Sequence, residues 1–141
     1  MATPYEKVCK RFLQKIKDFN LADLDDYSFN EMMMSWLNSS IVRIRKCDHD
    51  LSLRDDDAQE FSEDLSDLEI ELLALGMVDA WVTPMINSTE LTLQFIGGKE
   101  EKYFSQSQQL AELRNLKKEN SLEMQRLHSY HTYTNSSYFD D

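Results

Sequence analysis

The stretch LEIELLALGMVDAWV, residues 68–82, carries apolar side chains on almost every face of a helix. A helix that is apolar all round is buried among other elements. Ser66 and Glu69 have the spacing of a capping box, so the helix is expected to begin there. Gly76 costs about 1 kcal/mol relative to alanine in a helix interior, which favours a close crossing with another helix. Pro84 is expected to end or kink the helix.

Two amphipathic helices are expected before this central segment. Thr3 with Glu6, and Ser28 with Glu31, have capping-box spacing and predict the two starts. Met34 is expected to point away from the apolar stripe of the second helix. The first stripe comprises Tyr5, Val8, Cys9, Phe12, Ile16 and Phe19, and the second Phe29, Met32, Met33, Trp36, Leu37, Ile41 and Ile44. The side chains predicted to be buried between these helices are Trp36, Leu72, Leu75, Val78 and Trp81.

A long polar helix is expected near the C-terminus. Asn87 and Glu90 predict a short helical piece that Gly97-Gly98 breaks, and residues 99–104 are compatible with a small β-ribbon. The last helix is expected from about Ser105 to about Leu127. Its narrow apolar stripe suits peripheral or intermolecular packing better than a core. The stripe comprises Leu110, Leu113, Leu116, Met124 and Leu127.

The predicted fold is all-α: a compact helical bundle with a long C-terminal helix and an extended C-terminal tail. Three Gly and two Pro in 141 residues are too few for a β-sandwich or barrel, which needs frequent turns. Residues 1–128 form the expected helical domain. Residues 129–141, SYHTYTNSSYFDD, have no helical period and are expected to be disordered in isolation.

The negative charge of the chain lies mostly in one segment. The formal net charge is −11, and residues 48–71 hold eleven acidic residues against one basic, a net of −10. Nucleic-acid-binding domains cluster Lys and Arg instead, and an anionic membrane surface would repel this chain. No apolar run reaches the 18 residues of a membrane span, and the N-terminus lacks the apolar region of a signal peptide.

No motif predicts a metal site or a catalytic centre. The acidic segment fails the calcium-loop pattern from Asp48 and from Asp55. His128 and His131 have no third ligand nearby in the sequence, and His49 is distant. Cys9 and Cys47 have no CxxC spacing and are interpreted as reduced packing residues of a cytosolic protein. We therefore expect no enzyme activity and no cofactor.

The segment from Asp64 to Glu119, DLSDLEIELLALGMVDAWVTPMINSTELTLQFIGGKEEKYFSQSQQLAELRNLKKE, resembles small structural proteins of tailed phages that infect Gram-positive bacteria. The type is the helical head–tail connector, or adaptor, of the phage neck. The opening TPYEKVCKRFLQKI, residues 3–16, and the acidic connection after it also fit that group.

The resemblance implies a virion protein made in the host cytoplasm. Adaptors form a homo-oligomeric ring, usually of twelve subunits, beneath the portal protein. The ring extends the channel through which double-stranded DNA passes without specific binding, and it links the portal to the next neck or tail component. Adaptors have no catalytic residues, no cofactor and no membrane contact, and their C-terminal segments commonly dock against the portal.

Two candidate surfaces follow for this chain. Aromatic side chains in the tail are favoured interface anchors, so portal docking is assigned to Tyr130, Tyr133, Tyr138 and Phe139; an unattached chain end is the alternative. A solvated acidic surface, facing the DNA channel or the outer rim, is assigned to Asp48, Asp50, Asp55, Asp56, Asp57, Glu60, Glu63 and Asp64. The alternative function is a cytosolic acidic interaction or regulatory module, such as a DNA mimic; a metal-dependent enzyme using the acidic segment is a third class.

Overall fold

The computed structural model describes residues 2–16, 24–44, 49–96 and 100–134. Its elements, in chain order, are β1 (Thr3–Pro4), α1 (Tyr5–Leu13), α2 (Asp26–Arg43), β2 (Arg54–Asp55), β3 (Glu60–Phe61), α3 (Asp67–Ile96) and α4 (Glu100–Thr134). The architecture is all-α with a long C-terminal helix, as predicted from the sequence. None of the helices in the described ranges is long and apolar enough to cross a membrane.

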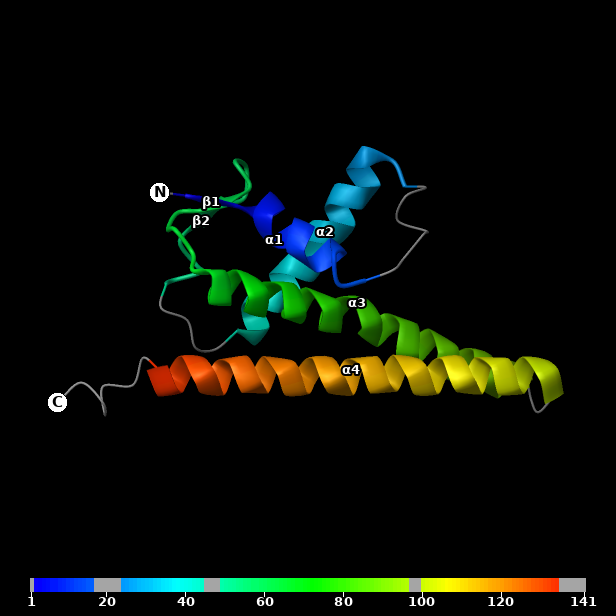
Figure 1. The fold of residues 1–141 in the computed structure, drawn as a ribbon. Coiled ribbons are helices and arrows are strands. Elements are labelled where there is room, and N and C mark those ends of the chain that lie inside the picture. The colour runs from blue at the N-terminus through cyan, green and yellow to red at the C-terminus, as the bar shows by residue number, and fades with distance from the viewer. Residues whose placement is uncertain (1, 17–23, 45–48, 97–99, 135–141) are drawn as a thin grey trace.

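Helix α3 is the centre of the molecule. Figure 1 shows α4 running along one side of α3, while α1 and α2 cover the other side. The side of α4 that faces away from α3 has no covering element among the described parts of the chain. The core therefore has two layers, one on each side of α3. Its largest fully buried side chains include Phe12, Met33, Leu37, Phe61, Ile70, Leu72, Leu73 and Met77.

The start of α3 confirms the predicted capping box. The backbone N–H of Glu69 donates to Ser66 Oγ at 3.2 Å, and the backbone N–H of Ser66 donates to Glu69 Oε1 at 2.9 Å. Of the five side chains predicted to be buried, Leu72, Leu75, Val78 and Trp81 are 0–7% exposed. Trp36 is only half-buried, with its ring 5.5 Å from that of Phe12.

Gly76 lies at the crossing of α2 and α3. A Cβ atom at this position would lie 2.1 Å from Ser40 Oγ and 3.2 Å from Ser40 Cα. The hydroxyl of the fully buried Ser40 donates to the backbone carbonyl of Leu73 at 2.6 Å. The predicted close crossing is confirmed, because only a residue without a side chain permits this approach.

The two capping boxes predicted for the first two helices are wrong, although α1 begins within one residue of its predicted start. The Thr3 hydroxyl donates to the Glu63 carbonyl at 2.9 Å and accepts from the Leu65 backbone N–H at 2.9 Å. Thr3 thereby anchors β1 beside β3 and makes no cap bond to α1. Helix α2 begins earlier than Ser28, because the Asp25 carboxylate accepts from the Ser28 backbone N–H at 2.9 Å.

Three short strands form a small antiparallel sheet in the order β1-β3-β2. Thr3 and Arg54 both lie opposite Phe61 in the register. The Phe61 ring is buried against Tyr5, with ring centroids 4.9 Å apart. The sheet therefore fixes the acidic segment to the start of α1, an arrangement not predicted from the sequence.

The predicted boundaries in the C-terminal half are also corrected. Helix α3 continues through Pro84 to Ile96, so the short separate piece predicted from Asn87 does not exist. Residues 100–104 are helical rather than a β-ribbon, and α4 begins at Glu100 instead of near Ser105. Helix α4 also continues past Leu127 to Thr134. Packing of the two long helices along each other offsets the hydrogen bond that Pro84 cannot donate.

The predicted burial of two methionines in α2 is wrong in opposite directions. Met32, expected in the apolar stripe of α2, is 39% exposed. Met34, expected to point elsewhere, is half-buried and packs against the core cluster. The buried side of α2 is centred on Met33, Leu37 and Ser40.

Ion pairs join α3 to both layers. Asp79 pairs with Arg43 of α2 and lies 3.9 Å from Lys117 Nζ of α4. Glu71, closer to the start of α3, pairs with Arg11 and Lys15 from the first helical segment. These ion pairs connect α3 to α2, to α4 and to the first helical segment.

Candidate functional site

The acidic segment folds into turns that its own carboxylates hold together. The Asp50 carboxylate accepts from the Ser52 hydroxyl at 2.6 Å and from the Ser52 backbone N–H at 3.0 Å. The hydroxyl bond, followed by the backbone bond, lowers the pKa of Asp50 below its ordinary value. The Asp55 carboxylate accepts from the backbone N–H groups of Asp57 and Ala58 at 3.0 and 3.2 Å. These two carboxylates therefore act locally as turn-forming residues.

Most of the predicted acidic surface is open to solvent. Five of its residues are exposed, namely Asp50, Asp55, Asp56, Asp57 and Asp64, while Glu60 and Glu63 are half-buried. Asp48 lies outside the described residues. The described members follow the loop from residue 50 to residue 64 rather than converging on one point.

The side chain of Asp56 connects the acidic loop to α1. Its Oδ1 atom accepts from the Tyr5 hydroxyl at 2.7 Å and lies 3.7 Å from Arg54 Nε. Burial, together with the hydrogen bond to Asp56, raises the pKa of the Tyr5 phenol above its ordinary value. The phenol therefore stays protonated and keeps the tip of the acidic loop against α1.

The sequence predicts Glu69 only as a capping residue of α3, but the structure shows that it is also a buried carboxylate in contact with His49. It is 1% exposed, and its Oε1 atom lies 2.6 Å from His49 Nδ1. Its Oε2 atom accepts from the His49 backbone N–H at 3.2 Å, and His49 Nε2 lies 3.8 Å from Glu63. The capping-box spacing predicted the bond to Ser66, but the contact with His49 depends on how the preceding loop returns to α3.

The candidate metal ligands and thiols are dispersed. Among the described residues, no three His, Cys, Asp or Glu side chains are grouped as metal ligands would be. His128 lies on α4, which also includes the backbone of His131. Cys9 is buried, and burial, with a smaller effect from Glu6, raises its thiol pKa to about 11. Cys9 is therefore a packing residue with little thiolate at neutral pH, and Cys47 lies outside the described residues.

Of the four aromatic residues predicted to dock against the portal, the structure describes the backbone of two. The backbones of Tyr130 and Tyr133 belong to the last turns of α4, and their side chains are outside the described part. Tyr138 and Phe139 lie outside the described residues. The start of the predicted tail, residues 129–134, therefore continues α4.

The solvent-facing side of α4 carries a regular stripe that was not identified from the sequence. Its positions follow the three- and four-residue spacing of one helix face, and all are exposed. Phe104 and Leu122 are 69% and 55% exposed. Lys118 is the charged member nearest the middle of this face, and the exposed Glu119 and Arg126 lie along its edge. We call this set the α4 stripe: Phe104, Gln108, Ala111, Asn115, Lys118, Leu122, Gln125 and Ser129.

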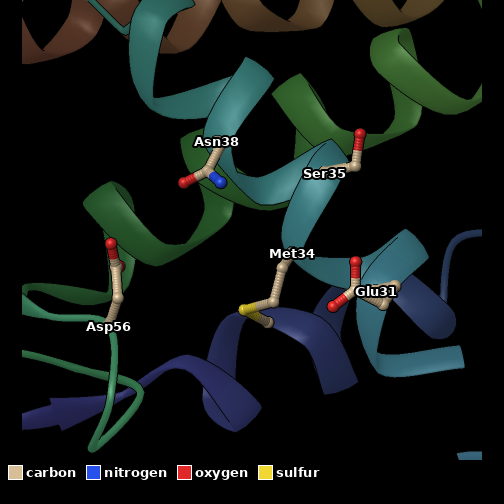
Figure 2. Close-up of a pocket in the computed structure, with 5 residues that line it drawn as sticks. All are labelled: Glu31, Met34, Ser35, Asn38 and Asp56. Carbon is tan, nitrogen blue, oxygen red and sulfur yellow. The ribbon is translucent and has the colours of Figure 1, made fainter. Parts of the chain in front are cut away.

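Helix α2 has a corresponding exposed face beside a hollow. We call its exposed positions the α2 stripe: Tyr27, Glu31, Ser35, Asn38 and Val42. Figure 2 shows three of these residues together with Met34, and Asp56 of the acidic loop lies across the hollow. The hollow has a volume of about 470 Å³. Tyr27 and Val42, at the two ends of the stripe, are 74% and 79% exposed.

Exposed helix stripes suit contact with another macromolecule better than chemistry on a small molecule. Both carboxylates that line the hollow, Glu31 and Asp56, are exposed, whereas catalytic carboxylates are typically placed in desolvated settings. Comparison of the chain with protein-family models, with characterised proteins and with solved structures finds no match.

Proposed function

We propose that this chain is a virion structural protein of a tailed phage, a head–tail connector without catalytic activity. In this proposal, copies of the chain form a ring beneath the portal protein, extend the DNA channel and contact the next neck or tail component. The resemblance of residues 64–119 to phage adaptors supports the assignment to this class.

The observation that carries the proposal is the incomplete covering of α4. The helix has 35 residues, about 50 Å of length at 1.5 Å per residue. Helix α3 covers one side of it, and the opposite side carries the exposed α4 stripe. A long helix with one uncovered face that includes exposed apolar side chains is typical of a subunit that is completed by neighbours in an assembly.

The charge distribution supports the DNA-channel part of the proposal. The acidic loop from residue 50 to residue 64 holds seven acidic residues against one basic residue, Arg54, which pairs with Asp56, so the loop repels phosphate groups. A ring that exposes this loop to passing DNA would let the duplex slide without binding it. The docking of the C-terminal aromatics against the portal is the further element of the same proposal.

Mass spectrometry of purified virions of the phage that encodes the chain tests the proposal. We expect the protein in stoichiometric amounts in mature particles and in neck fractions that contain the portal protein. Its absence from virions would refute the proposed function. Salt-sensitive competition with DNA for a basic host protein would instead support the regulatory alternative.

A variant series tests the docking role of the C-terminal aromatics. Truncation after Thr134 removes Tyr138 and Phe139 and leaves all of α4 in place. We expect the truncated chain to fold, by circular dichroism, and to lose incorporation into portal-containing heads. Replacement of Tyr130 and Tyr133 by alanine in the full chain tests the other two positions separately. Normal incorporation of both variants would refute docking through these residues.

A further inference from the structure

We propose that the α4 stripe of one copy packs antiparallel against the α2 stripe of a second copy, with Lys118 paired to Glu31. The two stripes are different surfaces of the chain, so the contact is heterologous and repeats from copy to copy. The inference rests on the proposed function in one respect: a ring requires each subunit to present two complementary faces.

The distribution of ion pairs on α4 points to Lys118. Arg114 pairs with Glu90 of α3, Lys117 lies near Asp79, and Arg126 pairs with Glu123 on the same helix. Within the described ranges, Lys118 makes no ion pair with an acidic side chain. It is also exposed and stands at the centre of a stripe whose other seven members are uncharged. The exposed Arg126 at the edge of this face is already paired with Glu123, so within the described ranges Lys118 is the cation of the face that has no acidic partner, and it favours an acidic surface as the one that packs there.

The opposite charge is found on the α2 stripe. Glu31 is exposed and is its only charged member, and within the described parts of the chain it makes no ion pair. Asp56 lies across the hollow from it and adds a second carboxylate, 72% exposed at its side chain. An ammonium group entering this hollow would meet both carboxylates, while the methylene chain of a lysine would lie along Met34 (Figure 2).

The spacing of the two stripes fits one antiparallel register. With Glu31 opposite Lys118, Tyr27 stands opposite Leu122, so the exposed apolar residues at one end meet. Ser35 and Asn38 then stand opposite Asn115 and Ala111. At the other end, Val42 stands opposite Gln108, one turn from Phe104. Each pairing follows from the three- and four-residue steps of both stripes, to within one position.

The length of the contact suits a weak subunit interface that a ring would strengthen. The α2 stripe spans 15 residue steps, which is about 22 Å of helix. Contact along one pair of helices of this length is below the area of a typical stable pairwise complex. Closure of a ring adds a second such contact to every subunit, so assembly is favoured over an isolated dimer.

Charge exchange in the purified full-length chain tests the inference. Sedimentation velocity and light scattering over about 1 µM to 1 mM, a range that covers weak to moderate dissociation constants, report self-association. We expect the unmodified chain to associate. Lys118→Glu and Glu31→Lys should each weaken association by about tenfold or more, because like charges then face each other. The variant with both substitutions should recover association to within about threefold of the unmodified chain.

Lys7→Glu is the matched control, because Lys7 is an exposed lysine on α1, outside both stripes. It changes the net charge as Lys118→Glu does and should leave association unchanged. The inference is refuted if the unmodified chain remains monomeric, if Lys118→Glu behaves like the control, or if the double variant fails to recover. These measurements use purified protein only, whereas the proposed function is decided by the composition of virions, so each can fail while the other holds.

Discussion

Replacement of Gly76 by alanine is the sharpest test of the packing around α3. The new Cβ would lie 2.1 Å from Ser40 Oγ, 2.9 Å from Ser40 Cβ and 3.2 Å from Ser40 Cα. Rotation of the serine side chain would relieve only the first of these contacts, and it would break the hydrogen bond to the Leu73 carbonyl. Helix α2 must therefore move away from α3.

The expected cost follows from three contributions. Overpacking of a tight helix crossing costs about 1–3 kcal/mol, and loss of the buried hydroxyl bond costs about 1 kcal/mol more. The higher helix propensity of alanine stabilises the helix by about 1 kcal/mol and offsets part of this loss. The net change in the free energy of unfolding is a loss of about 1–3 kcal/mol. At an m-value of about 2 kcal/mol/M, a loss of 2 kcal/mol lowers the urea midpoint by about 1 M.

Urea titration followed by far-UV circular dichroism measures this change, and a double-mutant cycle with Ser40→Ala locates its cause. Removal of the hydroxyl eliminates the shortest contact, so Gly76→Ala should cost less in the Ser40→Ala background, with a coupling of about 0.5–1.5 kcal/mol. An unchanged or higher midpoint for Gly76→Ala would refute the close crossing. Strict additivity of the two substitutions would refute the role assigned to the Ser40 hydroxyl.

Three further outcomes are expected. Trp81→Ala should lower the free energy of unfolding by about 3–5 kcal/mol, because the ring is 7% exposed in the core; a thermal midpoint equal to that of the unmodified chain would contradict its placement. Burial opposes ionisation of Glu71, but hydrogen bonds from Arg11 and Lys15 outweigh it and hold the pKa of Glu71 below its ordinary value of 4.5. Glu71→Gln should therefore be less stable than the unmodified chain above pH 4.5, and the difference should vanish as the pH falls through the lowered pKa; a pH-independent difference in urea titrations would disprove the ion pair's contribution. In a variant whose only cysteine is Cys9, the thiol should react with a disulfide reagent at neutral pH only after unfolding, because burial raises its pKa to about 11; rapid labelling of the folded protein would show that the site is open.

The role of α3 could be predicted from the sequence because the signals were local and dense. Apolar side chains on almost every face of residues 68–82 are compatible only with burial. The capping box of Ser66 and Glu69 depends on residues three positions apart, so the spacing was sufficient to predict it. Gly76 in such a helix indicated a close crossing, and the position of Ser40 identifies the other side of that crossing.

The wrong predictions of a helix cap and of a helix end arose where distant residues contact the same group. Thr3 has a capping residue's spacing to Glu6, but its hydroxyl bonds to the backbone of residues 63 and 65, just after β3. Pro84 is a local signal for a helix end, yet α4 packs along both halves of α3 and maintains one continuous helix. In both cases a long-range contact outweighs the local preference.

For the candidate surfaces, too, some properties follow from the sequence and others only from the tertiary structure. Composition and charge determined that this is an all-α chain with one strongly acidic segment, because both properties are sums over residues and need no coordinates. Only the tertiary structure decided that Glu69 is buried against His49 and that Lys118 of α4 and Glu31 of α2 remain exposed. Helical periodicity places residues on a face, but which face becomes buried depends on the elements that pack against it, and those contacts join residues far apart in the chain.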